Sequence, residues 1–224
     1  MRRRPPAPDH PTRRERPGSV ASIGPGEAGA GHGREGREGA RARPRRGRRR
    51  RPARDRAGHT GPGLSVRMAR LAPGHRAPVR AILEGTGLFR SSEVVDALEV
   101  FDAALGTGSK DYSLLGAFAE DGALLGYACY GPTPGTEGTW DLYWIAVAPD
   151  AQRRGIGSAL WRAIEPVLRR SGARLCVVET SGRGDYRATR RFYDRLGFRR
   201  IARTPDFYAD GEARVTYAKR LASL

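Results

Sequence analysis

The stretch from Ala146 to Leu160 carries residue types that bind phosphate groups. Gly155 and Gly157 lie between a predicted strand and a predicted helix, and because they lack a Cβ they let backbone amides approach a ligand closely. The first turn of a helix also offers N–H groups without intrahelical acceptors, at the positive end of the helix dipole. Arg153 and Arg154 add positive charge. These residues predict a pyrophosphate-binding turn, and by themselves they leave equally open a glycine turn that only starts a helix.

Two common phosphate-binding motifs do not fit this stretch. A Walker A loop needs a Gly-Lys-Ser/Thr sequence, and none follows here. The dinucleotide-binding fingerprint needs more than one pair of glycines and an acidic residue at a set distance after the next strand, and this pattern is not met.

The surrounding sequence predicts a mixed sheet with helices on both faces. Apolar periodicity and turn residues predict strands at 65–71, 113–119, 123–130, 139–147, 173–179, 198–203 and 215–219. Helices are predicted to begin near Pro78, at Ser91 and directly after the glycine turn. A fourth helix is predicted over 187–196. The apolar residues of the second helix follow helical spacing, which indicates one apolar face: they are Val94, Val95, Leu98, Phe101 and Leu105. Residues 206–208 are expected to form an ordinary loop between the last two strands. The alternative is a loop that closes over a substrate.

The composition of the 224-residue chain changes near residue 63. Residues 1–63 contain 18 Arg, 12 Gly and 9 Pro, without Phe, Trp or Tyr, and carry +12 of the total net charge of +17. Such a segment cannot bury enough apolar surface to offset the entropy lost on ordering. We therefore expect residues 1–63 to be a disordered extension and residues 64–224 to form one folded domain.

The composition also excludes several classes of protein. No apolar run approaches the about 20 residues of a membrane-spanning helix. Cys129 and Cys176 are too few for a disulfide framework and are expected to be reduced core residues. Three of the four histidines fall in residues 1–63 and His75 opens a predicted helix, so no metal cluster is predicted. Without an apolar stretch after the basic N-terminus we expect no secretion signal, no membrane partner and a cytoplasmic location.

Two motifs resemble those of the GNAT superfamily of acetyltransferases. Gln152-x-x-Gly155-x-Gly157 is similar to the family's Gln/Arg-x-x-Gly-x-Gly/Ala, which binds the pyrophosphate of acetyl-coenzyme A (acetyl-CoA). The stretch from Ala188 to Phe198 is similar to its Ala-x-x-Phe-Tyr-x-x-x-Gly-Phe, at the family's usual separation. The resemblance implies a GNAT-type α/β (α+β) fold, with a mixed, mostly antiparallel central sheet between helices.

The resemblance also implies which residues bind the cofactor. The end of the preceding strand would splay from its neighbour and bind the pantetheine arm through the backbone of Ile145, Ala146 and Val147. The pyrophosphate would lie on the turn formed by Gln152, Arg153, Arg154, Gly155, Ile156, Gly157 and Ser158. Many members have Asn three residues before the Ala of the second motif, where this chain has Asp185, so the pantetheine contact of that Asn is not carried over.

Acetyl transfer to an amine needs a neutral nucleophile, a polarised thioester carbonyl and a proton for the leaving thiolate. Tyr193 matches the family's tyrosine that supplies this proton, and the alternative for it is a core aromatic. Asp141 lies six residues before Val147, where histone acetyltransferases of this superfamily carry a glutamate base. Alternation along the strand predicts that Asp141 shares a face with Tyr143, Ile145 and Val147. The alternative is an exposed or Arg-paired carboxylate. Glu84 and Glu137, both in predicted loops, are weaker candidates.

The residues and the resemblance together predict an acetyl-CoA-dependent N-acetyltransferase without a metal. The acceptor would be a primary amine of a small molecule or a peptide, and Glu84, Glu137 and Asp141 favour slightly a small cationic one. Two other functions stay open: a nucleic-acid-associated protein that acts through residues 1–63, and an acyl-CoA-binding module without catalysis. Dimers are common in the family, which leaves a homodimer open.

The Arg-rich segment either binds nucleic acid or has no binding role. Arg45 to Arg51 would bind nucleic acid through phosphate charge, although the segment offers no aromatic residue for base stacking. We favour a passive arm or a misassigned extension, with the true start near Leu64–Met68, because a GC-rich genome explains 39 Arg against two Lys in the whole chain. Mass spectrometry of the native N-terminus tests the misassigned start: a misassigned start predicts no peptides from residues 1–60, and finding them would exclude it and leave the passive arm.

Overall fold

The structure is a computed structural model that describes residues 65–106 and 110–221. Within these residues seven strands form one sheet in the order β1-β2-β3-β4-β5-β7-β6. Every neighbouring pair is antiparallel except β4 and β5, which are parallel. The mixed, mostly antiparallel fold is therefore confirmed. The predictions about residues 1–63 fall outside the described residues.

The elements follow the predicted order. The strands are β1 (Arg67–Arg70), β2 (Ser113–Phe118), β3 (Leu124–Pro132), β4 (Thr139–Val147), β5 (Leu175–Ser181), β6 (Arg199–Ala209) and β7 (Glu212–Arg220). The helices are η1 (Pro73–His75), α1 (Arg76–Gly85), α2 (Ser91–Leu105), η2 (Pro149–Ala151), α3 (Ile156–Arg170) and α4 (Arg187–Arg195).

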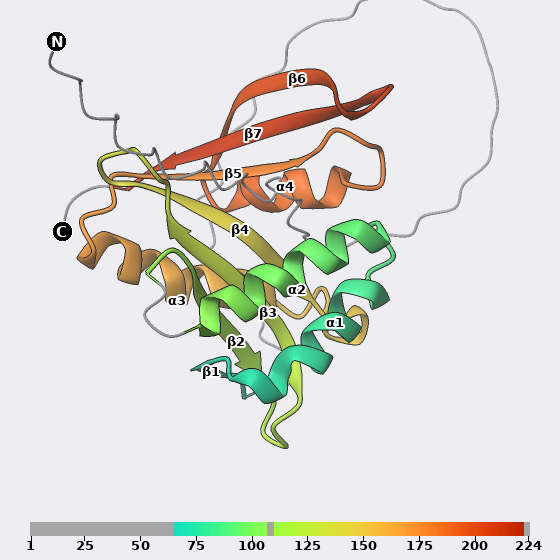
Figure 1. The fold of residues 1–224 in the computed structure, drawn as a ribbon, viewed down its shortest axis with the longest axis vertical. Helices are drawn as coiled ribbons and strands as arrows, with labels where there is room; N and C mark the ends of the chain where they lie inside the picture. Colours follow the sequence, from blue (N-terminus) through green and yellow to red (C-terminus); the bar gives the residue numbers. More distant parts are fainter. Residues whose placement is uncertain (1–64, 107–109, 222–224) are drawn as a thin grey trace, which may run out of the picture.

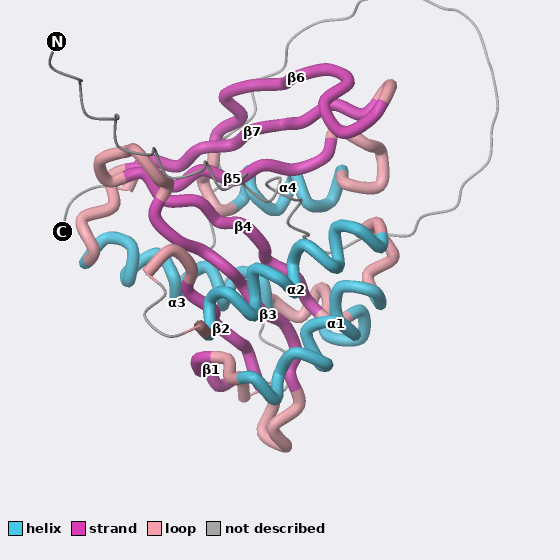
Figure 2. Tube along the Cα trace, viewed as in Figure 1, coloured by secondary structure: helices cyan, strands magenta, loops and turns pink. Residues whose placement is uncertain are grey.

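Two layers of helices enclose the sheet, and each layer has its own apolar core. Helices α1 and α2 cross one face (Figures 1 and 2), where Leu83, Leu98 and Phe101 pack on Tyr127 and Trp144 of the sheet. Helices α3 and α4 cover the opposite face. Their main contributions to this second core are Leu160, Trp161, Ile164, Leu168, Phe192 and Tyr193.

Two predictions about local structure were wrong. Val95 is 48% exposed, because Val94, Leu98 and Phe101 define the buried face of α2 and Val95 lies about 100° around the helix from Val94. Residues 206–208 belong to β6 and not to a loop. The chain reverses later, at Asp210 and Gly211, where Gly211 has a φ of +78°, as tight hairpin turns require.

Candidate functional site

β4 and β5 pair only over their first three residues. The parallel register joins Thr139 to Leu175 and ends at Asp141 opposite Val177. Beyond this point β5 stays paired with β7 as far as Ser181, while the other edge of β4 stays paired with β3 as far as Val147. Within the part of the chain that the structure describes, the edge of β4 that faces β5 therefore has no strand partner from Leu142 to Val147. The predicted splay of this strand is present, and below we call it the β4–β5 divergence.

A β-bulge lies where the two strands separate. Cys129 of β3 is opposite Trp144, and the next residue of β3, Tyr130, is opposite Leu142, so Tyr143 is an extra residue in β4. A bulge bends its strand and increases the local twist. This distortion accounts for β4 leaving β5 while it keeps its pairing with β3.

A pocket of about 160 Å³ lies at the end of β4, against the first turn of α3 and the side of α4. It brings together most of the turn residues predicted to bind a cofactor. Its lining consists of Val147, Ala151, Gln152, Arg153, Gly155, Ile156, Gly157, Ser158, Phe192 and Arg195. Three predicted residues, Ile145, Ala146 and Arg154, do not line it: the first two are buried in the cores, and Arg154 is exposed.

The turn before α3 presents backbone N–H groups to this pocket. Arg153 and Gly155 have φ angles of 59° and 82°, in the left-handed region that Gly155 adopts without strain. The N–H groups in the first turn of a helix have no acceptors within the helix, and among the described residues no side chain caps those of α3. The side-chain amide of Gln152 donates to the carbonyl of Val147 over 3.3 Å and ties the turn to the end of β4.

Gly157 packs closely against α4. A Cβ at this position would lie 3.2 Å from Cζ of Phe192, closer than side chains normally allow. The absent side chain lets α3 and α4 approach each other at the pocket. Sequence reasoning placed Phe192 in the second motif but assigned it no role, and it missed Arg195, three residues further along α4.

Tyr193 lies on the α3–α4 face of the sheet and is fully buried. Its hydroxyl has no hydrogen-bond partner among the described residues, and its ring packs on Phe198 and Tyr217 at 5.7 Å between centroids. Burial, assisted by the nearby thiol of Cys176, raises the pKa of Tyr193 well above its ordinary value. The phenol therefore stays protonated over the physiological range.

Asp141 does not share a face with Ile145 and Val147, and this prediction was wrong. Because Tyr143 is an extra residue, the alternation of side chains shifts between Asp141 and Ile145. Ile145 and Val147 belong to the core under α3 and α4, whereas Asp141 points to the face that α1 and α2 cover. Its carboxylate accepts a hydrogen bond of 2.8 Å from Thr133 Oγ1.

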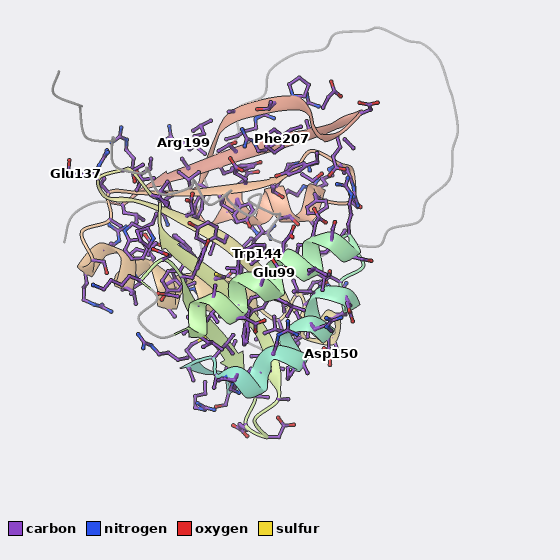
Figure 3. The ribbon with its side chains drawn as sticks, in the orientation of Figure 1. Glu99, Glu137, Trp144, Asp150, Arg199 and Phe207 are labelled. Carbon is purple, nitrogen blue, oxygen red and sulfur yellow. The ribbon has the colours of Figure 1, made fainter. Side chains whose placement is uncertain are left out.

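The two weaker acidic candidates lie at opposite ends of β4. Glu84 lies in the last turn of α1 rather than in a loop and pairs with Arg80. The adjacent Gly85 approaches Pro149, just beyond the last residue of β4. Glu137 precedes the first residue of β4, and Figure 3 shows it far from Asp150. A nine-residue strand is about 30 Å long, so Glu84 and Glu137 are too far apart to bind one acceptor.

Two tryptophans of β4 and the two cysteines lie in the cores or their margins. Trp144 is fully buried, whereas Trp140 is only partly buried and packs on the opposite core. Burial raises the pKa of the Cys129 and Cys176 thiols above the usual range, which makes them poor nucleophiles. Among the described residues there is no group of three or more potential metal ligands and no helix long and apolar enough to cross a membrane.

Comparison with known proteins identifies the family. The family model described as the Acetyltransferase (GNAT) family matches residues 87–198. A solved structure from Desulfovibrio desulfuricans, assigned to the same family, is 42% identical with a TM-score of 0.67, over 70% of this chain and all of that one. The chain belongs to the GNAT family of acetyltransferases.

Solved structures of lower identity share the GNAT fold. The ribosomal-protein-S18-alanine N-acetyltransferase of Escherichia coli is 20% identical with a TM-score of 0.59, over 71% of this chain and 96% of that one. An acetyltransferase-like protein of Salmonella typhimurium, solved with acetyl-CoA, is 20% identical with a TM-score of 0.57 and the same coverage. None of the curated proteins matches the chain.

At the position of the Asn that many GNAT proteins carry, Asp185 is held by a neighbouring side chain. The guanidinium of Arg183 donates two hydrogen bonds to its carboxylate, which lowers the pKa of Asp185 despite partial burial. The carboxylate is therefore engaged in the loop before α4, which agrees with leaving the pantetheine contact of the Asn out of the predicted site.

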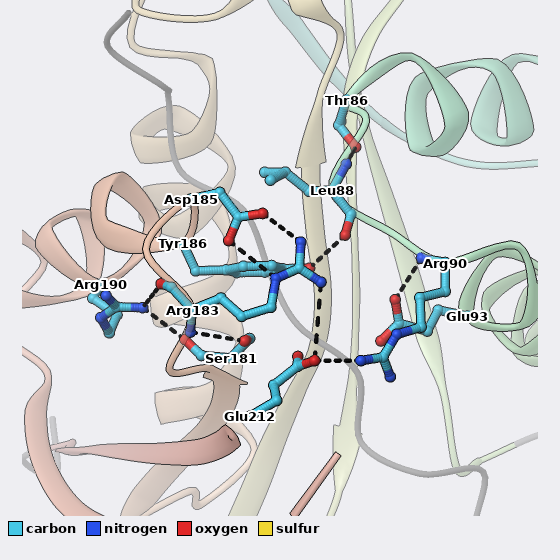
Figure 4. A network of polar contacts seen from close by, with 10 residues as sticks. All are labelled: Thr86, Leu88, Arg90, Glu93, Ser181, Arg183, Asp185, Tyr186, Arg190 and Glu212. Atoms are coloured by element: carbon cyan, nitrogen blue, oxygen red, sulfur yellow. Dashed lines mark hydrogen bonds and ion pairs between the residues drawn. The ribbon is translucent and has the colours of Figure 1, made fainter. Parts of the chain in front are cut away.

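A polar network ties this loop to the segment between α1 and α2 (Figure 4). The Tyr186 hydroxyl donates to the carbonyl of Leu88 over 3.0 Å, and Arg90 forms an ion pair with Glu212 of β7. Arg183 reaches the same carboxylate at 4.0 Å. Residues about 100 positions apart thus hold three segments together beside the β4–β5 divergence.

We predict that Tyr186→Phe loosens the segment between α1 and α2. The substitution removes the hydroxyl that donates to Leu88, and we expect a loss of about 0.5–1.5 kcal/mol in the free energy of unfolding. Urea denaturation measures this loss, and amide hydrogen exchange should be faster around residues 86–90. Tyr127→Phe is the matched control, because it removes a buried hydroxyl without a partner among the described residues and should not destabilise the protein. Equal losses in both variants would contradict the assignment.

Proposed function

We propose that this GNAT protein binds acetyl-CoA at the turn before α3 and transfers the acetyl group to a primary amine. The observation that carries the proposal is the pocket at the end of β4, where uncapped helix N–H groups meet the side chains of Arg153 and Arg195. N–H groups at a helix N-terminus and guanidinium forks both suit a pyrophosphate. In this proposal residues 64–224 form the catalytic domain.

The β4–β5 divergence offers a path for the pantetheine arm. The backbone of Ile145, Ala146 and Val147 has hydrogen-bonding capacity on the edge that faces away from β3, and no strand occupies that edge. The amide groups of pantetheine are natural partners for such an unpaired strand edge. Side-chain contacts of Ile145 are not needed for this role, which agrees with its burial in the core.

The two proposed catalytic groups lie on opposite faces of the sheet at the divergence. Tyr193, whose protonated hydroxyl has no partner within residues 65–106 and 110–221, lies on the face of α3 and α4 that also carries the pocket. Asp141 lies on the face of α1 and α2. We propose that the amine arrives from the α1–α2 face, where Asp141 accepts its proton directly or through water. The amine nitrogen forms a bond to the thioester carbonyl carbon, the bond from that carbon to sulfur breaks, and Tyr193 donates its proton to the leaving thiolate.

The acceptor is a primary amine of a small molecule or of a peptide. Structurally similar proteins include enzymes named for a ribosomal-protein alanine and for an aminoglycoside, and both are at or below 20% identity. They share the fold with this chain and do not choose between the two classes of acceptor. The separation of Glu84 from Glu137 removes the earlier reason for preferring a small cation.

We predict that Gly155→Asp and Gly157→Asp abolish acetyl-CoA binding. Both place a carboxylate in the proposed pyrophosphate site, and the second also crowds Phe192. Isothermal titration calorimetry of the full chain should show micromolar binding that both variants lose. Gly172→Asp is the matched control for Gly155→Asp: its φ is 75° against 82°, its Cβ also meets open space, and it lies beyond the far end of α3. Failure of the parent to bind would remove the basis of the proposed function.

We predict that Tyr193→Phe lowers kcat about 100-fold or more and leaves KM for acetyl-CoA nearly unchanged, because only the proton donor is removed. The free energy of unfolding should not fall, since the lost hydroxyl is buried without a partner among the described residues. Thiol release with a panel of amines measures the rate. An unchanged kcat would make Tyr193 a core aromatic, and binding without turnover in the parent would favour an acyl-CoA-binding module.

A further inference from the structure

A strongly basic surface runs from α4 onto β6. Residues 187–203 contain seven arginines and a single acidic residue, Asp194. Five of these arginines, which we call the arginine band, are Arg187, Arg191, Arg195, Arg200 and Arg203, and all five are exposed. The GNAT motif ends at Phe198 and does not account for this charge.

The helix part of the band follows from helical spacing. Arg187, Arg191 and Arg195 are four residues apart, so they form one row along the outer side of α4, about 6 Å apart in rise. Thr189 and Tyr193 occupy the inner side against the sheet. Arg195, at one end of the row, lines the proposed cofactor pocket.

The strand part of the band depends on a β-bulge in β6. Arg200 is opposite Tyr217 and Arg203 is opposite Val215, while Ile201 is left without a partner between them. In a regular strand, residues three apart point to opposite faces. The extra residue turns both Arg200 and Arg203 to the face of Tyr217 and Val215, which is the face that α4 covers.

The helix and strand parts of the band are neighbours. Helix α4 packs directly against β6. Burial lowers the pKa of Arg190 in α4, and the charges of both Arg187 and Arg200 act in the same direction, against the raising effects of Tyr217 and Asp185. Among the described residues, none of the five band arginines has an ion pair or a side-chain hydrogen bond. Like charges four residues apart destabilise a helix, so the band lowers the stability of the protein unless an anion neutralises it.

We propose that the arginine band binds the phosphodiester backbone of a nucleic acid. Guanidinium forks bind phosphate oxygens, and backbone contacts need charge without an apolar surface. An acidic protein fits less well, because stable protein interfaces have an apolar or aromatic centre. The band has no aromatic residue, and Ile201 is the large exposed aliphatic residue beside it. The binding is independent of base sequence and steeply dependent on salt.

The test compares two full-length variants that each lose four charges. R187Q/R191Q/R200Q/R203Q removes the band except Arg195, which stays because it lines the pocket. R67Q/R70Q/R162Q/R170Q removes four exposed arginines of β1 and α3. Fluorescence anisotropy with a labelled single-stranded RNA of about 20 nucleotides gives the affinity from about 50 to 200 mM salt. Residues 1–63 are present in both variants, so their contribution to binding is the same.

We expect the band variant to lose at least about tenfold in affinity, with a slope of log K against log salt shallower by about 3. The matched variant should stay within about twofold of the parent. If the quadruple variant does not fold, the double variants R187Q/R191Q and R200Q/R203Q replace it. Each should show about half of the expected change in slope. Equal losses in the two quadruple variants, or no loss in either, would overturn the proposal.

Two further measurements distinguish this proposal from binding of an acidic protein and from the proposed transferase function. Polyglutamate that displaces the RNA as well as unlabelled RNA does, at equal charge, would overturn a phosphodiester ligand and point to an acidic protein. Acetyl-CoA binding by the band variant should match the parent, because none of the four residues lines the pocket. The RNA measurement does not use acetyl-CoA, so failure of the proposed transferase function would leave this result intact.

Discussion

The three-residue pairing between β4 and β5 is the constraint on which the rest of the candidate site depends. Those strands form the parallel pair of the described sheet, and their pairing ends at Asp141 and Val177. Because β4 keeps its antiparallel pairing with β3 and β5 keeps its pairing with β7, the sheet stays continuous while its middle separates. The separation leaves one edge of β4 unpaired and allows groups from both faces to approach the same place.

The pocket at the end of β4 depends on close packing as much as on charge. Gly155 lets the chain take a left-handed conformation before α3, and Gly157 lets α3 approach Phe192 of α4. The same approach brings Arg195 to the pocket beside Arg153. Anion-binding capacity therefore comes from two helices that β5 separates in the sequence, and the core between them fixes their distance.

Two β-bulges decide which side chains share a face. The bulge at Tyr143 places Asp141 on the face opposite Ile145, and the bulge at Ile201 places Arg200 and Arg203 on the same face. In both strands one extra residue reverses the alternation that a regular strand would give. The bulge at Tyr143 sets the side of the sheet from which a base can act. The bulge at Ile201 concentrates positive charge beside α4.

The sequence by itself determined the order of the elements, the GNAT motifs, the position of the glycine turn and the burial of most of the apolar helix faces. These features depend on local periodicity and on residues within one turn, which a sequence displays directly. Tertiary structure alone decided the face of Asp141, the place of Arg195 in the pocket, the bond from Tyr186 to Leu88 and the separation of Glu84 from Glu137. Bulges leave no mark on apolar periodicity, and contacts between residues up to about 100 positions apart depend on how the whole chain packs.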